Sequence, residues 1–157
     1  MRGWQLSDLE KLSARGMKVS VAPIPKNRVV IGVKKIPSLN RLRDKAQAAF
    51  NLFIRNRDAQ KGCISCQSGK VEQAGHFFNA GQYTALRFNE DNVHGSCLQC
   101  NYFLSGNLLA YRERLLKKIG ERRLYLLERD AKLNRVKKWS RTELEIIYKM
   151  YKEKNRA

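Results

Sequence analysis

Four cysteines stand in two pairs of equal spacing, Cys63-x-x-Cys66 and Cys97-x-x-Cys100. A two-residue gap lets the chain turn so that both thiolates of a pair reach one tetrahedral metal ion, with Zn–S distances near ~2.3 Å. Four thiolates saturate zinc and leave no position for water, so the predicted ion is structural. Two disulfides, or free buried cysteines, are the alternatives.

Polar side chains with catalytic potential lie inside and beside this cysteine frame. His76 is on a predicted strand between the two pairs, and Asn101 follows Cys100 directly. If zinc brings the two segments together, both side chains face one small cleft. There an imidazole can act as general base for a water that attacks a phosphodiester, and an amide oxygen can help hold Mg²⁺. The alternatives are a packed strand histidine and a helix-capping asparagine.

The elements that must position these residues predict an α+β fold. A helix is expected from Ser38, with apolar residues at helical spacing on one face: Leu39, Leu42, Ala46, Ala49, Phe50 and Phe53. Arg57, near the end of that stripe, either extends out of the core or turns towards an anion. Residues 62–101 contain two short strand-like pieces, KVEQAGHFF and YTALRF. Their composition favours a small motif held by metal.

Three further helices are expected after the second cysteine pair. The first has Asn107 as N-cap and ends at Gly120, and the second buries Leu124, Leu127 and Ala131. The third opens with a capping box formed by Ser140 and Glu143, and its apolar stripe contains Leu144, Ile147, Tyr148 and Tyr151.

The predicted organisation has four parts. Residues 1–37 form an N-terminal arm without an assigned role, containing a short helix begun by Ser7 and a strand at RVVIGVKKI. Residues 38–61 form a basic amphipathic helix, residues 62–107 the zinc-framed core, and residues 108–157 the basic C-terminal helices.

The charge balance points to a polyanionic partner. The chain has 157 residues and a formal net charge of +18. This favours nucleic acid first and an acidic membrane surface second. No run of apolar residues is long enough to span a bilayer, and the start lacks the apolar core of a signal peptide, so we expect a cytoplasmic protein and no membrane partner. The interleaved basic residues either follow phosphates or form a solvated face.

Several stretches resemble the NinG/Rap family of lambdoid phage recombination proteins. They are FIRNRD, GCISC, AGHF, LRFNEDNVH, CLQCN, SGNL and YRERL, in this order from about Leu39 to the C-terminal helix. The core also resembles the HNH, or ββα-metal, nucleases, and particularly phage endonuclease VII, a Holliday-junction resolvase. The resemblance implies a small zinc-stapled treble-clef or HNH-like ββα core with flanking α-helices.

The resemblance also implies an activity and site roles. It implies a structure-specific endonuclease that cuts branched DNA, such as Holliday junctions and D-loops, in a bacterial or phage-infected cell. Zinc would be structural, and Mg²⁺ or Mn²⁺ catalytic. By the resemblance, His76 is the general base, Asn101 takes a metal-ligand position, and Asn92 braces the loop that carries the histidine.

One departure from the HNH pattern concerns the residue before the base. That position, usually an aspartate that binds metal, is Gly75. Glu72, Glu90 and Asp91 are the nearby carboxylates that could replace it, or they are solvated surface acids. His94 has three interpretations: a hydrogen-bond partner behind the site, a substitute metal ligand, or a packed residue beside the cysteines.

The candidate phosphate contacts are Arg55, Arg57, Arg87 and Arg112. Two other functions remain open: a non-catalytic zinc module that binds branched DNA or recruits a recombinase or single-strand-annealing protein, and a basic RNA-binding factor. Symmetric cutting of a junction would favour a homodimer.

Overall fold

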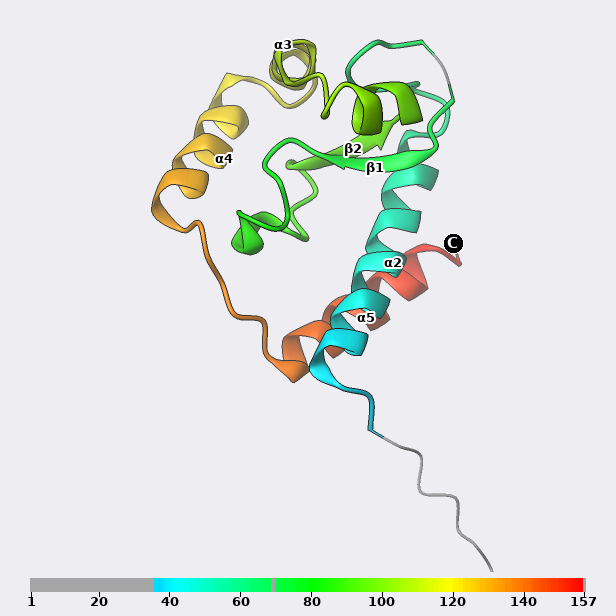
Figure 1. Ribbon diagram of the computed structural model, residues 1–157, viewed down its shortest axis with the longest axis vertical. Helices are drawn as coiled ribbons and strands as arrows, with labels where there is room; N and C mark the ends of the chain where they lie inside the picture. The colour runs from blue at the N-terminus through cyan, green and yellow to red at the C-terminus, as the bar shows by residue number, and fades with distance from the viewer. Residues whose placement is uncertain (1–35, 69, 157) are drawn as a thin grey trace, which may run out of the picture. The chain divides into compact units, whose positions relative to one another are not determined.

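The computed structural model describes residues 36–68 and 70–156. The helix and all but the last residue of the strand expected before Pro37 therefore lie outside the described residues. Within these described residues, four α-helices, two strands and two short helical turns follow one another; Figure 1 shows their arrangement. They are α2 (Leu39–Asp58), β1 (Gln73–His76), η1 (Thr84–Leu86), β2 (Val93–Ser96), η2 (Gln99–Phe103), α3 (Leu108–Ile119), α4 (Glu121–Leu133) and α5 (Arg141–Lys154).

Helix α2 begins where the sequence predicts, because the Ser38 hydroxyl accepts a hydrogen bond from the Arg41 amide at 3.3 Å. Its buried face packs against α5, which runs beside it (Figure 1). The capping box of α5 is present: Ser140 Oγ accepts from the Glu143 amide, and the Glu143 carboxylate accepts from the Ser140 amide. The predictions for both helix starts are confirmed.

Strands β1 and β2 form a two-stranded antiparallel sheet in which His76 opposes Val93 and Gly75 opposes His94. Hydrogen bonds from Glu72 N to Ser96 O (3.0 Å) and from Phe77 N to Asn92 O (2.8 Å) continue the pairing at both ends. Helices combined with a small sheet and a four-cysteine cluster confirm the α+β class.

The prediction of a strand at YTALRF is wrong. Thr84–Leu86 is a single 3-10 turn, and the strand that pairs with β1 is Val93–Ser96. Side chains satisfy the turn's carbonyls, because Trp139 Nε1 donates to Thr84 O at 2.9 Å and Asn92 Nδ2 donates to Leu86 O at 3.1 Å. The turn therefore needs no neighbouring strand.

Two hydrophobic clusters pack the described elements together. The first joins α2 to α5 and contains Val93 of β2; its buried members are Leu42, Ala46, Phe50, Ile54, Phe88, Val93, Leu144 and Tyr151. The second joins α3 to α4 and contains Ile64 of the first cysteine pair; its buried members are Ile64, Leu86, Tyr111, Leu115, Leu124, Leu127 and Ala131. The predicted buried face of α4 is thereby confirmed.

Helix α3 begins and ends at the residues that the sequence predicts. Gly120 closes it with φ 82°, a backbone conformation that favours glycine. Asn107 occupies the predicted N-cap position with φ 48°, and its carbonyl accepts from Tyr111 N at 3.0 Å, although its side chain makes no capping hydrogen bond. None of the described helices combines the length and apolarity needed to cross a bilayer.

Candidate functional site

The four cysteine sulphurs converge on one point. The Sγ atoms of Cys63, Cys66, Cys97 and Cys100 all lie within 4.8 Å of one another, and Cys66 Sγ is 3.8 Å from Cys97 Sγ. Tetrahedral zinc requires sulphurs about 3.8 Å apart, whereas a disulfide requires about 2 Å. All four cysteines are free thiols, so the disulfide alternative does not hold for this structure. The donor set fits a metal such as zinc, and the prediction that both pairs form one cluster is confirmed.

Backbone hydrogen bonds connect this cluster to the sheet. Ile64 N donates to Gly95 O of β2 at 2.9 Å, which joins the first pair to the strand. After Cys97 the chain turns into the π-helical segment η2, where Asn101 N donates to Cys97 O at 3.0 Å. The cluster thus fixes both the strand pair and the segment that carries Asn101.

His76 and Asn101 line the same cavity, which has a volume of about 540 Å³. Its wall comes from β1 and the loop after it, and from η2 with the turn before α3. Polar lining is also contributed by Asn79 and Ser105. Both side chains of the predicted pair therefore border the same cavity.

One hydrogen bond fixes the protonation of the His76 ring. Its Nε2 lies 3.1 Å from the Arg87 carbonyl oxygen, which can only accept, so Nε2 carries the proton and Nδ1 keeps a lone pair. Burial lowers the pKa of His76; the hydrogen bond to Arg87 opposes this change, and the Arg87 charge adds to it. The ring is therefore neutral at pH 7 and suited to accept a proton.

Asn101 and Gly75 are in close proximity. Asn101 Nδ2 donates to Gln73 Oε1, which leaves Oδ1 as the atom able to bind a cation. A Cβ on Gly75 would lie 2.9 Å from Asn101 Oδ1 and 2.9 Å from Ser96 Oγ. An aspartate at this position would clash with both, so the departure from the HNH pattern is built into the packing.

Asn92 is fully buried and joins the loop after His76 to the turn before Arg87. Its Oδ1 accepts from Phe78 N at 2.7 Å, and its Nδ2 donates to Phe78 O at 3.0 Å and to Leu86 O at 3.1 Å. These hydrogen bonds connect the loop after His76 to the 3-10 turn, and the bracing role of Asn92 stays a prediction.

The candidate carboxylates lie away from the His76 cavity. Glu72 accepts a hydrogen bond from Leu98 N at 2.9 Å, Asp91 pairs with Arg123, and Glu90 binds Tyr151 and Lys154. No carboxylate is present among the described residues that line the cavity. Mg²⁺ is usually bound by one or two carboxylates together with substrate phosphates. The donor set of this cavity therefore fits a catalytic Mg²⁺ or Mn²⁺ incompletely.

His94 is a buried residue of β2 and does not line the cavity. Its Nδ1 lies 3.3 Å from the Tyr111 hydroxyl, which in turn donates to the Gly75 carbonyl at 3.0 Å. Burial, followed by the charges of Lys118 and Arg57, lowers the pKa of His94 to about 3. Of the three interpretations, the contacts match a packed hydrogen-bond partner.

The four candidate phosphate contacts differ in their surroundings. Arg57 is bound to Asp58 and the Val93 carbonyl, and Arg87 to Gln47 and the Ala80 carbonyl. Arg112 pairs with Glu128 at 2.8 Å. Arg55 is half-buried on α2. Arg57 thus turns towards an anion within the protein, and the sequence did not indicate which one.

Fold and site together define a class: an α+β chain with a four-cysteine cluster that could hold zinc beside a cavity lined by histidine and asparagine. Residues 20–157 match the family model described as Bacteriophage Lambda NinG protein. The chain belongs to the NinG family, which confirms the resemblance found in the sequence.

Two relatives illustrate the similarity. Over 112 residues the chain is 39% identical to Protein ninG of Salmonella phage P22 and 38% identical to Protein ninG of Escherichia phage lambda. These alignments cover 70% of this chain and 54% and 53% of the relatives, so the chain spans about half the length of the curated relatives it matches. No solved structure matches the chain.

Proposed function

We propose that this protein is a structure-specific DNA endonuclease that cuts branched recombination intermediates, such as Holliday junctions and D-loops, in the infected bacterial cell. The observation that carries the proposal is that His76 and Asn101 line one cavity, with the proton of His76 held on Nε2 by the Arg87 carbonyl. Membership of the NinG family supports the choice of DNA recombination as the setting.

In this proposal the hairpin, the cysteine cluster and the following helix form an HNH-like core. His76 Nδ1 takes the proton from a water molecule that attacks the scissile phosphate. Asn92 holds the loop after His76, and Asn101 Oδ1 faces the substrate. A divalent cation bound there with DNA phosphate oxygens would stabilise negative charge on the phosphate.

The test is cleavage of synthetic Holliday junctions and D-loops with Mg²⁺ or Mn²⁺. We expect His76→Ala to lower the single-turnover rate by about 10²-fold or more, the range of a general base. Ser105→Ala is the matched control, because Ser105 lines the same cavity without a proposed chemical role. If a folded, zinc-loaded His76→Ala protein cuts as fast as the wild type, the assigned mechanism is wrong.

The second candidate is a non-catalytic protein that binds branched DNA and assists a recombinase or annealing protein. The lack of a carboxylate among the described cavity-lining residues favours it. Tight junction binding without cleavage in any of several divalent metals would select this function. The mass of the free protein and of its DNA complex would show whether either activity uses a homodimer.

A further inference from the structure

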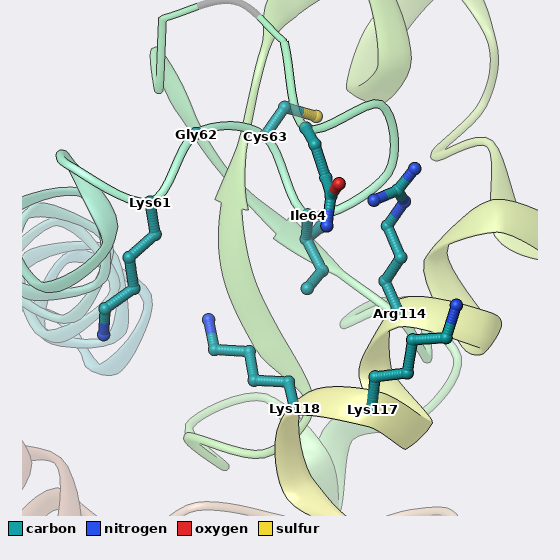
Figure 2. A pocket seen from close by; sticks show the side chains of 8 residues that line it. Lys61, Gly62, Cys63, Ile64, Arg114, Lys117 and Lys118 are labelled. Atoms are coloured by element: carbon teal, nitrogen blue, oxygen red, sulfur yellow. The ribbon is translucent and has the colours of Figure 1, made fainter.

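A basic pocket of about 370 Å³ lies between the first cysteine pair and α3, separate from the His76 cavity. Figure 2 shows Arg114, Lys117 and Lys118 extending from α3 beneath the loop that carries Gly62 and Cys63. Lys61 and Gln67 complete its polar lining. No acidic side chain is present among the described residues that form the wall.

Carboxylates balance the positive charges of this pocket only partly. Lys118 Nζ lies 3.1 Å from Asp58 Oδ1, and Lys61 Nζ lies 3.7 Å from the same oxygen. Asp58 also pairs with Arg57, so its single negative charge cannot neutralise both lysines. Lys117 pairs with Glu113 on the exposed side of α3.

Arg114 forms no ion pair with any described residue and is half-buried at the pocket. Burial lowers the pKa of Lys118, and the charges of Arg57 and Lys61 lower it further, against the effect of Asp58. An anion entering the pocket would relieve this repulsion. A guanidinium together with ammonium groups is the donor set that phosphate oxygens prefer.

We propose that this pocket binds a backbone phosphate of a DNA arm, held chiefly by Arg114 and Lys117. The choice of DNA over a free phosphate rests on the proposed function and on the net charge of +18, which favours a polyanion. None of the four arginines that the sequence suggested lies in this pocket.

The pocket is connected through backbone hydrogen bonds to the strand that carries His76. Cys63 and Ile64 line the pocket, and Ile64 N donates to Gly95 O of β2, which pairs with the strand that carries His76. A phosphate bound here is thus placed at a fixed separation from the His76 cavity. Such a contact positions a DNA arm by its shape without reading its sequence.

The experiment compares two double variants of equal charge in junction binding, without added Mg²⁺ or Mn²⁺. Arg114→Ala/Lys117→Ala removes pocket cations while sparing Lys118, which contacts buried Asp58. Lys149→Ala/Arg156→Ala removes two cations from the exposed end of the chain, outside the pocket. We expect the pocket variant to bind about tenfold more weakly, and the slope of log K against log salt to become shallower by about 1, since one phosphate contact is lost. The control should change affinity much less.

Equal affinity for the two double variants, both folded and zinc-loaded, would overturn the proposal. A second arm titrates wild type and the pocket variant with inorganic phosphate. Tight phosphate binding that the variant loses, with DNA affinity unchanged, would assign the pocket to a free phosphate instead. Failure of the proposed nuclease activity would give a different result. The wild type would cut no junction, but the pocket variant would still bind junctions more weakly than the wild type.

Discussion

His76 is the residue on which the proposed chemistry depends, and its ring is oriented by the backbone. The Arg87 carbonyl holds Nε2–H, and Asn92 in turn fixes the carbonyl of neighbouring Leu86. The ring is therefore oriented by a backbone carbonyl and not by a side chain such as an aspartate. Its Nδ1 is left to accept a proton. A change at Asn92 would act on this orientation through two hydrogen-bonded segments.

The pH profile of cleavage should report the lowered pKa of His76. A base works in its neutral form, and burial keeps the ring neutral to lower pH than an ordinary histidine with a pKa of 6.5. We expect the single-turnover rate at saturating metal to rise with pH through a midpoint below 6.5 and then to level off. A midpoint above 6.5 would contradict the neutral, buried base. Junction binding measured over the same range controls for changes in affinity.

Gly75 should resist the substitution that would restore the HNH pattern. Its missing Cβ leaves space that Asn101 Oδ1 and Ser96 Oγ occupy. We expect Gly75→Ala to lower the free energy of unfolding by about 1–3 kcal/mol, and Gly75→Asp to do so at least as strongly without raising cleavage. Urea unfolding measures the first effect. Gly81→Ala is the control, since a Cβ there meets only the Asn79 side chain. Faster cleavage by a stable Gly75→Asp protein would show that the packing tolerates a carboxylate.

At the scale of residues, the sequence predicted the cysteine cluster but not the partners of the polar side chains around it. Two C-x-x-C pairs are typical of a single metal site bound by all four thiolates. The convergence of the four sulphurs could therefore be inferred from the sequence. The partners of Glu72 and Asp91 could not be inferred, because Leu98 N and Arg123 come near them only in the folded chain. Gln73, which binds Asn101, carried no signal because a glutamine on a short strand is usually exposed.

At the scale of elements, Asp58 links one helix to a strand and to a second helix. It is the last residue of α2, it accepts from Gly95 N of β2 at 2.9 Å, and it binds Lys118 of α3. Arg57 completes the group from the neighbouring position. These contacts hold the pKa of the Asp58 carboxyl well below its usual value of 3.8, in spite of burial, which acts in the opposite direction.

Loss of this charge should destabilise the protein. Asp58→Asn leaves Lys118 without its anion and Arg57 with only Glu90, 3.8 Å away, and we expect it to lower the free energy of unfolding by about 3 kcal/mol. Because the folded pKa is depressed, the contribution of Asp58 is complete above pH 3.8 and declines as pH falls below that value. Denaturant unfolding at pH 7 and below pH 4 measures both effects. Asp44→Asn, at an exposed carboxylate paired with Arg43, is the control and should change stability little.

Helices were predicted better than strands for a physical reason. The described helices carry one-sided apolar stripes, and α2 and α5 also begin with side-chain caps; both features are local signals. The residues of β2 are His94, Gly95 and Ser96 after Val93, and all four are buried. A strand buried on both faces shows no alternation, so its position depends on contacts that the local sequence does not reveal.

At the scale of the molecule, the two hydrophobic clusters depend on the cysteine cluster to different degrees. Ile64 lies inside the first C-x-x-C pair and belongs to the cluster with α3 and α4. The cluster of α2 and α5 contains no residue from within either cysteine pair. Zinc should therefore stabilise the cluster of α3 and α4 more than the cluster of α2 and α5.

Removal of the metal should unfold the part that contains the cysteines first. The free energy of structural zinc binding, about 10–16 kcal/mol in small domains, is comparable with the whole stability of a domain. We expect one zinc per chain in the wild type. Chelation or Cys97→Ser should remove it and abolish amide protection in β1, β2 and α3, with residual helix from α2 and α5. Metal analysis, circular dichroism and amide exchange measure these outcomes.

Added zinc should restore the chelated wild type but not the Cys97→Ser protein. A metal-free wild-type protein with full amide protection would contradict the assignment of the cluster. The same experiment bears on the NinG relatives only over the segment they share with this chain, about half of their length.

Gly95 gives a way to follow how the parts of the chain open. Its amide is bonded to the buried carboxylate at the end of α2, and its carbonyl is bonded to the first cysteine pair. The exchange rate of this one amide hydrogen therefore reports an opening event that separates the helix from the sheet. If this amide exchanges at the rate of global unfolding, the two clusters form a single cooperative unit; if it exchanges faster, the hairpin opens while α2 and α5 remain packed. A single resonance in a nuclear magnetic resonance spectrum would thus measure the cooperativity of the described chain.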